Sequence, residues 1–247
     1  MIYRFATFNL RNSTANDGKD SWPHRSSQVL DLLRYYAWDA VGFQEMTGVQ
    51  KEAIAGIGGY AVEGISRDND EVGEHCCVFY RRDRFERLDG GTYWLSSTPE
   101  VPSKGWGAEC IRICTWVLLK DRGNGRAFAF VNTHLDHISE EARAEGAKVI
   151  LERIGKQFAG IPVVLTGDFN ATPDERCYRD ITAVMTDTKR APGAFHYGPS
   201  GSFHGFRPEG AFGNLPEIDY IFVSRDIRTL KARTIADRDD RGYPSDH

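Results

Sequence analysis

The sequence has few cysteines, no long apolar run and no excess of positive charge. Its five cysteines are an odd number and two of them are adjacent, which excludes a disulfide framework. No apolar run approaches the ~20 residues of a membrane-spanning helix. Met1 leads into IYRFATFNL without the basic and apolar regions of a signal peptide. We therefore expect a cytoplasmic protein with free thiols and no membrane anchor.

The charge balance limits the class of binding partner. The chain has 31 Lys and Arg residues against 35 Asp and Glu residues, a formal net charge of -4. This composition argues against a strongly basic protein that binds duplex DNA without sequence preference. A local basic rim or a metal ion could still receive phosphate groups.

The size and composition predict one folded domain over residues 1–247, and we expect it to be a monomer. Hydrophobic residues make up 40% of the sequence and aromatic residues 12%, which is enough to bury a substantial core. A chain of 247 residues fits one large α/β domain more easily than two small ones.

Short apolar runs of strand length alternate with helical patterns. The runs that predict strands are residues 2–8, 40–44, 76–81, 113–119, 128–135, 163–167 and 219–224. Helical periodicity covers residues 139–158, with Ser139 as the N-cap, and residues 24–36. Short turns between strands favour two mainly antiparallel sheets that pack together, with helices outside. Residues 196–217 form the longest stretch without periodicity, which is typical of a functional loop.

Polar side chains lie at the ends of five of the predicted strands. These residues are Asn9, Glu45, His134, Asp136, Asp168, Asn170 and Asp219. Each one alone has a simpler explanation, because Asp and Asn are common turn formers. Their repetition favours a shared site, since sites are usually assembled where strands end. Carboxylate and amide oxygens suit Mg²⁺, with Mn²⁺ as the alternative, rather than zinc.

Six motifs, taken together, resemble those of the endonuclease/exonuclease/phosphatase superfamily. They are FNLRN (8–12), GFQEM (42–46), NTHLDH (132–137), LTGDFNATP (165–173), IDYIFVS (218–224) and SDH (245–247). They occur in the family's order and span the chain. The resemblance implies a four-layer α/β sandwich and a Mg²⁺-dependent phosphodiesterase or phosphatase. NTHLDH is similar to the deadenylase and nocturnin branch and to uncharacterised bacterial members.

The resemblance also implies a role for individual residues around a metal and a phosphate. Glu45 corresponds to the main metal ligand, Asn9 lies close to both metal and phosphate, and Asp246 supports the metal or its waters. Asn170 corresponds to a residue that holds the phosphate. Asp136, Arg112 and His204 are further candidates for substrate contact. Phosphate binding and structural pairing are equally good explanations of Arg112, and bracing of the loop is an equally good explanation of His204.

The proton-transfer groups follow from the same resemblance. Asp168 would orient or deprotonate the attacking water, and His134 would donate to a phosphoryl oxygen. Asp219 would orient His247, and Glu74 matches a carboxylate that secretory deoxyribonucleases pair with the imidazole corresponding to His134. An acid beside an imidazole fixes its tautomer and raises its basicity. The sequence leaves open which imidazole acts as acid or base.

The first functional hypothesis is a phosphodiesterase whose substrate is RNA, single-stranded DNA or a nucleotide. The alternative is a phosphatase or a phospholipid phosphodiesterase similar to sphingomyelinases. A catalytically inactive binding domain is disfavoured, because Glu45 and Asp168 are both present. Trp22 and Arg25 are expected at the rim of the site. We also expect a further strand after His247, since an apolar strand follows this histidine in the family.

Overall fold

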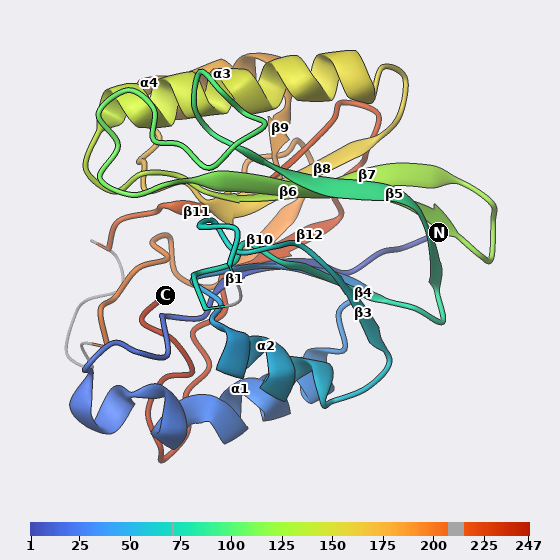
Figure 1. The fold of residues 1–247 in the computed structure, drawn as a ribbon. Coiled ribbons are helices and arrows are strands. Elements are labelled where there is room, and N and C mark those ends of the chain that lie inside the picture. The colour runs from blue at the N-terminus through green and yellow to red at the C-terminus, as the bar shows by residue number, and fades with distance from the viewer. Residues whose placement is uncertain (71, 207–214) are drawn as a thin grey trace.

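The computed structural model describes residues 1–70, 72–206 and 215–247, which form four layers (Figure 1). Helices α1 (Trp22–Tyr36) and α2 (Gly48–Ala55) cover a four-stranded sheet on one side of the molecule. Helices α3 (Glu140–Gln157) and α4 (Arg176–Val184) cover a six-stranded sheet on the other side. The four-layer α/β sandwich expected from the sequence is confirmed.

Both sheets are mixed rather than purely antiparallel. The four-stranded sheet has the order β1 (Phe5–Asn9), β2 (Ala40–Gln44), β4 (Val78–Arg81) and β3 (Tyr60–Glu63). The six-stranded sheet has the order β5 (Phe85–Trp94), β6 (Ile113–Asp121), β7 (Ala127–His134), β8 (Val163–Asp168), β11 (Asp219–Val223) and β9 (Thr186–Asp187). The pairs β1–β2 and β7–β8 are parallel, and the other pairs of these two sheets are antiparallel. In each parallel pair, a helix connects one strand to the next, as parallel pairing requires.

A small parallel ribbon, β10 (Phe195–Tyr197) with β12 (Lys231–Arg233), corrects part of the predicted loop. The segment expected to be loop over 196–217 begins inside β10, and its residues 207–214 lie outside the described residues. A 3-10 helix (Gly18–Asp20) precedes α1.

Apolar cores separate the layers. Helix α3 buries Ala147 and Ile150 against Val131 and Leu165 of the six-stranded sheet. The N-cap expected at Ser139 is confirmed, because its hydroxyl accepts a hydrogen bond from the Ala142 N–H at 3.1 Å. Burial of apolar surface of this kind contributes about 25 cal/mol per Å², so these cores hold the helices against the sheets.

A buried polar layer fixes one sheet against the other. The Gln44 side chain of β2 donates to Asn132 Oδ1 of β7 at 2.6 Å, and Asn132 Nδ2 donates to the Phe43 carbonyl at 2.8 Å. The backbone of β2 lies so close to side chains of the other sheet that a Cβ on Gly42 would be 2.3 Å from Thr166 Oγ1 and 2.4 Å from Asn132 Oδ1. Only glycine fits at position 42, and this contact sets how the strand ends of the two sheets meet.

No helix in the described part of the chain is long and apolar enough to cross a membrane.

Candidate active site

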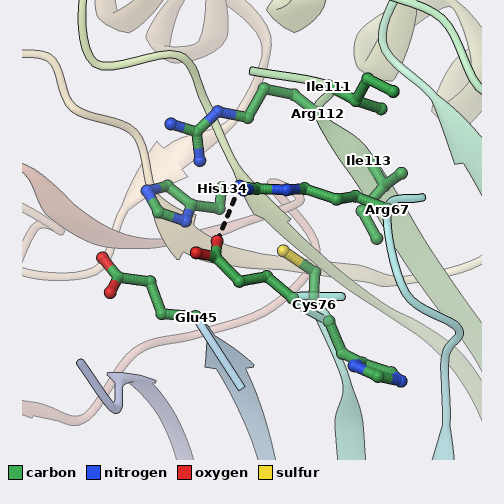
Figure 2. Close-up of a pocket in the computed structure, with 9 residues that line it drawn as sticks. Glu45, Arg67, Cys76, Ile111, Arg112, Ile113 and His134 are labelled. Carbon is green, nitrogen blue, oxygen red and sulfur yellow. Dashed lines mark hydrogen bonds and ion pairs between the residues drawn. The ribbon is translucent and has the colours of Figure 1, made fainter. Parts of the chain in front are cut away.

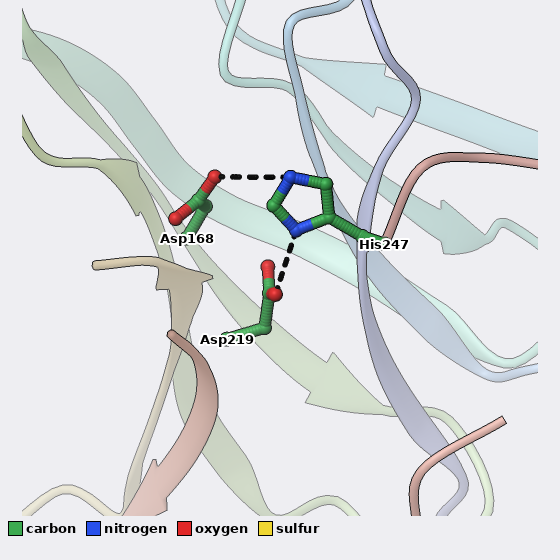
Figure 3. A group of neighbouring side chains, drawn as sticks. All are labelled: Asp168, Asp219 and His247. Carbon is green, nitrogen blue, oxygen red and sulfur yellow. Dashed lines mark hydrogen bonds and ion pairs between the residues drawn. The ribbon is translucent and has the colours of Figure 1, made fainter. Parts of the chain in front are cut away.

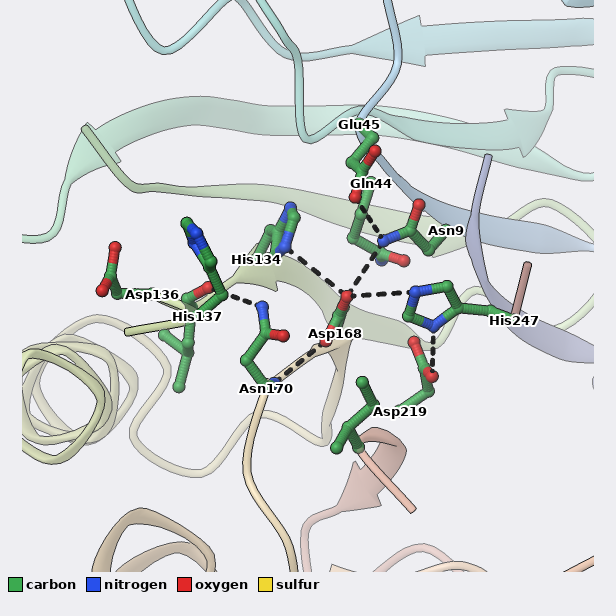
Figure 4. A network of polar contacts seen from close by, with 12 residues as sticks. Asn9, Gln44, Glu45, His134, Asp136, His137, Asp168, Asn170, Asp219 and His247 are labelled. Carbon is green, nitrogen blue, oxygen red and sulfur yellow. Dashed lines mark hydrogen bonds and ion pairs between the residues drawn. The ribbon is translucent and has the colours of Figure 1, made fainter. Parts of the chain in front are cut away.

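The polar strand ends predicted from the sequence meet at one edge of the sandwich (Figure 4). Asn9 ends β1 and Glu45 follows β2, which pairs with β1 in parallel. His134 and Asp168 end the parallel strands β7 and β8 and lie opposite each other in the register. Asp219 begins β11, which is antiparallel to β8, and it pairs with Asp168 in the register. The strand pattern therefore places five polar side chains around one space.

Glu45 has the environment of a cation ligand. Among the described residues, its carboxylate accepts hydrogen bonds only from amides, from Asn9 Nδ2 at 3.1 Å and the Asn12 N–H at 2.8 Å. Asp246 is buried, and burial together with the Glu45 carboxylate raises its pKa. Two neighbouring carboxylates and an amide oxygen form a hard donor set that fits Mg²⁺ or Mn²⁺.

Asp168 lies at the centre of the network. Its Oδ2 accepts a hydrogen bond from Asn9 Nδ2 at 2.9 Å and lies 3.5 Å from His134 Nε2, while Oδ1 accepts from the Asn170 N–H at 2.9 Å. Burial, and then the neighbouring charge of Asp219, raise the pKa of Asp168 to about 7. A buried carboxylate with this pKa is suited to accept a proton near neutral pH.

His247 is held between two carboxylates (Figure 3). Its Nδ1 lies 2.8 Å from Asp219 Oδ2 and its Nε2 lies 3.7 Å from Asp168 Oδ2. Burial opposes the charged ring, but Asp219 and then Asp168 raise the pKa of His247 to about 10. Ligand atoms of Asp168, Asp219 and His247 lie within 4.8 Å of one another, as in a metal site. A protonated imidazole has no free lone pair, so His247 in its charged form does not offer a metal ligand.

Ser202 holds Asp219 in place. Its hydroxyl donates to Asp219 Oδ2 at 2.6 Å and accepts the Asp219 N–H at 3.0 Å. The expected orientation of His247 by Asp219 therefore has a structural support that comes from the segment before β11.

His134 is buried, and its pKa is shifted in the opposite direction. Burial, followed by the charges of Arg112 and His247, lowers the pKa of His134 well below its usual value. The neutral ring is a hydrogen-bond donor or acceptor at neutral pH, and it is not a fixed cation.

Glu74 does not make the contact that the resemblance implied. Its carboxylate accepts from Asn12 Nδ2 at 2.7 Å and from Arg67 at 2.7 Å, so both oxygens are used away from His134. Glu74 and His134 line the same cavity without pairing. The physical reason is that Arg67, 7 residues before Glu74 in the chain, provides a charged partner that a neutral imidazole cannot match.

Asp136 supports a loop rather than facing a substrate. Its carboxylate accepts four backbone N–H groups, those of Glu109, Cys110, Ile138 and Ser139, at 2.9–3.3 Å. These bonds lower its pKa against the effect of burial, which would raise it. With both oxygens occupied, Asp136 positions the segments that carry Arg112 and His137.

His204 packs against the C-terminal motif. The ring of His204 lies 4.3 Å from that of Tyr243, and the backbone N–H of His204 donates to the Asp246 carbonyl at 2.8 Å. Burial and the charge of His247 lower the pKa of His204 to about 4. Of the two roles considered for His204, these contacts favour bracing of the loop.

Arg25 and Trp22 are buried, which corrects their expected place at the rim. Arg25 is only 2% exposed and Trp22 only 5%. The sequence also gave no role to Arg67 or Asn12. Asn12 lies inside the FNLRN motif, which is a usable signal, whereas Arg67 lies in a polar loop without any local pattern.

Two site residues adopt a backbone conformation that costs energy. Glu45 has φ 56° and Asn170 has φ 47°, both in the left-handed region. Such strain concentrates at functional sites, where the surrounding structure holds it in place. In this chain, the two residues with this conformation are Glu45, directly after β2, and Asn170, in the turn after β8, and both belong to the predicted site.

Comparison with known proteins agrees with this geometry. The model of the Endonuclease/Exonuclease/phosphatase family matches residues 6–247. A Bacteroides thetaiotaomicron mannosyl-6-phosphatase is 34% identical with a TM-score of 0.92, and the match covers 100% of this chain and 97% of that one. An endonuclease/exonuclease/phosphatase from Bacteroides vulgatus is also 34% identical, with a TM-score of 0.94 over 99% of this chain and 95% of that one.

Among curated proteins, Drosophila melanogaster nocturnin is 28% identical over 177 residues. The match covers 65% of this chain but only 26% of nocturnin. The chain thus corresponds to about a quarter of that relative.

Proposed function

Because the chain belongs to the endonuclease/exonuclease/phosphatase family, whose members hydrolyse phosphate esters, we propose that it cleaves such an ester by direct attack of water activated by Asp168. One observation carries this proposal. The Oδ2 atom of Asp168 lies within reach of Asn9, His134 and His247, and burial with Asp219 raises the pKa of this carboxyl to about 7.

Asp168 takes a proton from the water molecule while the oxygen of that water forms a bond to phosphorus. The ester P–O bond breaks on the opposite side, the leaving alkoxide takes a proton from solvent, and Asp168 afterwards releases its proton to solvent. The backbone N–H of Asn170 and the amide of Asn9 hold the carboxylate in one orientation. This positioning supports catalysis because the base need not reorganise during the reaction.

The two imidazoles have different tasks. His247, with a pKa of about 10, stays charged at neutral pH and stabilises negative charge on the phosphoryl oxygens. His134 is neutral and donates a hydrogen bond through one ring nitrogen. Asp219 keeps His247 charged and fixes its ring through Nδ1 at 2.8 Å.

A divalent cation would be held by Glu45, Asn9 and Asp246. When bound, it supplies charge neutralisation and polarisation of the phosphoryl group. The donor set described above fits Mg²⁺ or Mn²⁺. The Glu45 carboxylate contributes to the raised pKa of Asp246, and a bound cation would lessen this repulsion between two negative charges.

Two substrate classes compete for this site. Similarity to a protein named as a mannosyl-6-phosphatase over the whole chain supports a phosphomonoester. The nocturnin resemblance, at 28% identity over 65% of the chain, is the reason to test RNA and single-stranded DNA. The net charge of -4 favours a small substrate, since phosphate contacts dominate the affinity for long nucleic acids.

The test is metal binding and hydrolysis measured in the same variants. Wild type should bind Mn²⁺ in calorimetry and hydrolyse p-nitrophenyl phosphate, bis-p-nitrophenyl phosphate or an oligonucleotide in Mg²⁺. Glu45→Gln should weaken Mn²⁺ binding and lower turnover by at least about a hundredfold. The exposed Glu86→Gln is the control and should match wild type. Unchanged Mn²⁺ affinity in Glu45→Gln would disprove the assignment of the ligand.

A further inference from the structure

A cavity beside His134 carries two arginines that the hydrolytic step does not use. It is lined on its charged side by Glu45, Arg67, Glu74, Arg112 and His134, and we call it the arginine pocket. The guanidinium groups of Arg67 and Arg112 are turned toward His134 (Figure 2). The pocket therefore adjoins the position at which phosphoryl oxygens would meet this imidazole.

Arg112 is buried without a close counter-ion. Its side chain is 7% exposed, and its Nε has no hydrogen-bond partner among the described residues. The nearest carboxylate oxygen, Asp136 Oδ2, lies 3.7 Å from Nε and already accepts two backbone N–H groups. The other end of the guanidinium contacts His137 Nδ1 at 3.0 Å. Burying an incompletely paired charge is costly. A bound anion would complete the pairing of Arg112 and offset this cost.

The backbone of Arg67 is anchored by two hydrogen bonds. Its backbone carbonyl accepts the Trp94 indole N–H at 2.7 Å, and its N–H donates to the Glu74 carbonyl at 2.8 Å. The guanidinium binds Glu74 through one nitrogen at 2.7 Å. A guanidinium presents five donors, so this bond leaves others for an oxyanion.

One part of the pocket lining is apolar. Cys76, Ile111 and Ile113 form this wall, and Cys76 and Ile113 belong to one buried cluster that Ile111 packs against. A terminal phosphoryl oxygen can end at such a wall. The cationic groups that line the pocket beside this wall are Arg67 and Arg112.

We propose that Arg67 and Arg112 form a subsite for the terminal phosphoryl group of a phosphomonoester dianion, so that this chain prefers monoesters over diesters. The inference rests on the proposed hydrolytic function and specifies its substrate class. The dianion has three terminal oxygens and one more negative charge than a diester. Guanidinium groups bind such oxygens with charge-assisted hydrogen bonds about twice as strong as neutral ones. The reaction releases an alcohol and inorganic phosphate.

The experiment compares p-nitrophenyl phosphate with bis-p-nitrophenyl phosphate, which share a leaving group, in the full chain with Mg²⁺. Wild type should favour the monoester in kcat/KM by at least about tenfold. Arg67→Gln should reduce monoester kcat/KM about tenfold to a hundredfold more than diester kcat/KM, mainly through KM. The exposed Arg87→Gln, whose partner Glu63 lies away from the pocket, is the matched control and should keep the wild-type ratio.

Phosphate inhibition of wild type gives a measurement that does not depend on a variant folding. Inorganic phosphate should inhibit competitively, and dimethyl phosphate, a diester monoanion, should inhibit at least about tenfold more weakly. Equal inhibition by the two anions, a wild-type preference for the diester, or a ratio unchanged by Arg67→Gln would each overturn the subsite while hydrolysis itself stands. Failure to hydrolyse either ester would instead refute the proposed function.

Discussion

Arg25 donates a hydrogen bond from Nη1 to the Pro244 carbonyl at 2.9 Å, joining residues 219 positions apart. The same guanidinium donates to the carbonyls of Leu10 at 2.6 Å, Arg11 at 2.7 Å and Asp20 at 2.9 Å. Residues 10 and 11 follow Asn9, and Pro244 precedes the Ser-Asp-His motif. One buried cation therefore ties the first site motif to the last.

Replacing Arg25 with Met should lower both stability and activity. Removing the guanidinium leaves buried carbonyls without donors, which costs about 2–4 kcal/mol in the free energy of unfolding. Urea denaturation and kcat measure the two effects. Arg34→Met, on an exposed part of the same helix, should change the free energy of unfolding by less than about 0.5 kcal/mol. A stable and fully active Arg25→Met protein would contradict the role of Arg25 as a clamp.

The activity of the wild-type enzyme should fall on the acid side of pH 7. The pKa of Asp168 is raised from 3.8 to about 7, and a general base works only when deprotonated. Thus kcat/KM is expected to be full above this pKa and to drop as the pH falls through it. An acid limb near the ordinary aspartate pKa of about 3.9 would argue against Asp168 as the base.

Asp168→Asn separates loss of chemistry from loss of fold. Turnover should fall by about a hundredfold to ten-thousandfold. The raised pKa means that the folded protein favours the protonated carboxyl of Asp168 over the ionised carboxylate. The stability contributed by the protonated form is therefore present at low pH and is lost as the pH rises through about 7. The neutral amide avoids this loss, so the melting temperature of Asp168→Asn at pH 8 should equal or exceed that of wild type. A large drop in melting temperature would point to a structural defect.

Gly42→Ala should destabilise the junction of the two sheets. The added Cβ would lie 2.3 Å from Thr166 Oγ1 and 2.4 Å from Asn132 Oδ1, and the buried layer has little freedom to move. We expect a loss of about 3 kcal/mol in the free energy of unfolding, seen by urea denaturation. Gly155→Ala is the control, since position 155 is exposed in α3 with nothing within 4 Å of the new Cβ. It should stabilise the protein by up to about 1 kcal/mol; equal effects at both positions would refute the close approach.

Glu217 should support the fold only above acidic pH. Burial alone would raise its pKa, but hydrogen bonds and charge from Arg190 and Lys189 lower it. A lowered folded pKa means that this stability is present above the ordinary glutamate pKa of about 4.3 and is lost as the pH falls through the folded value. Glu217→Gln should therefore be less stable than wild type at pH 7, by about 1–2 kcal/mol.

This difference between wild type and Glu217→Gln should shrink in strongly acidic buffer. Thermal unfolding across a pH series measures it, with Glu86→Gln as an exposed control. A difference that is constant with pH would show that the lost contact is packing and not charge.

Regular elements with strong apolar patterns were predictable from the sequence, and weakly patterned ones were not. The helix expected over 139–158 is α3 (Glu140–Gln157), with Ser139 as its cap. Strand β5 (Phe85–Trp94) was missed because its segment FERLDGGTYW carries three charged residues and two glycines. It forms a strand because it pairs along the edge of β6, and tertiary pairing overrides local preference. The short helices α2 and α4 gave too few turns for a clear period.

The sequence by itself determined the family, the four layers and the residues that meet in the site. The motifs carry the family resemblance, and they lie at strand ends. Parallel pairing of β1 with β2 and of β7 with β8, together with the start of the antiparallel strand β11, brings these ends to one edge. Only the tertiary structure decided which polar groups pair there. Glu74 binds Arg67 and not His134, Asp136 is taken up by backbone N–H groups, and Arg25 is buried as a clamp. These choices depend on distances and burial between segments far apart in the chain, which no local pattern records.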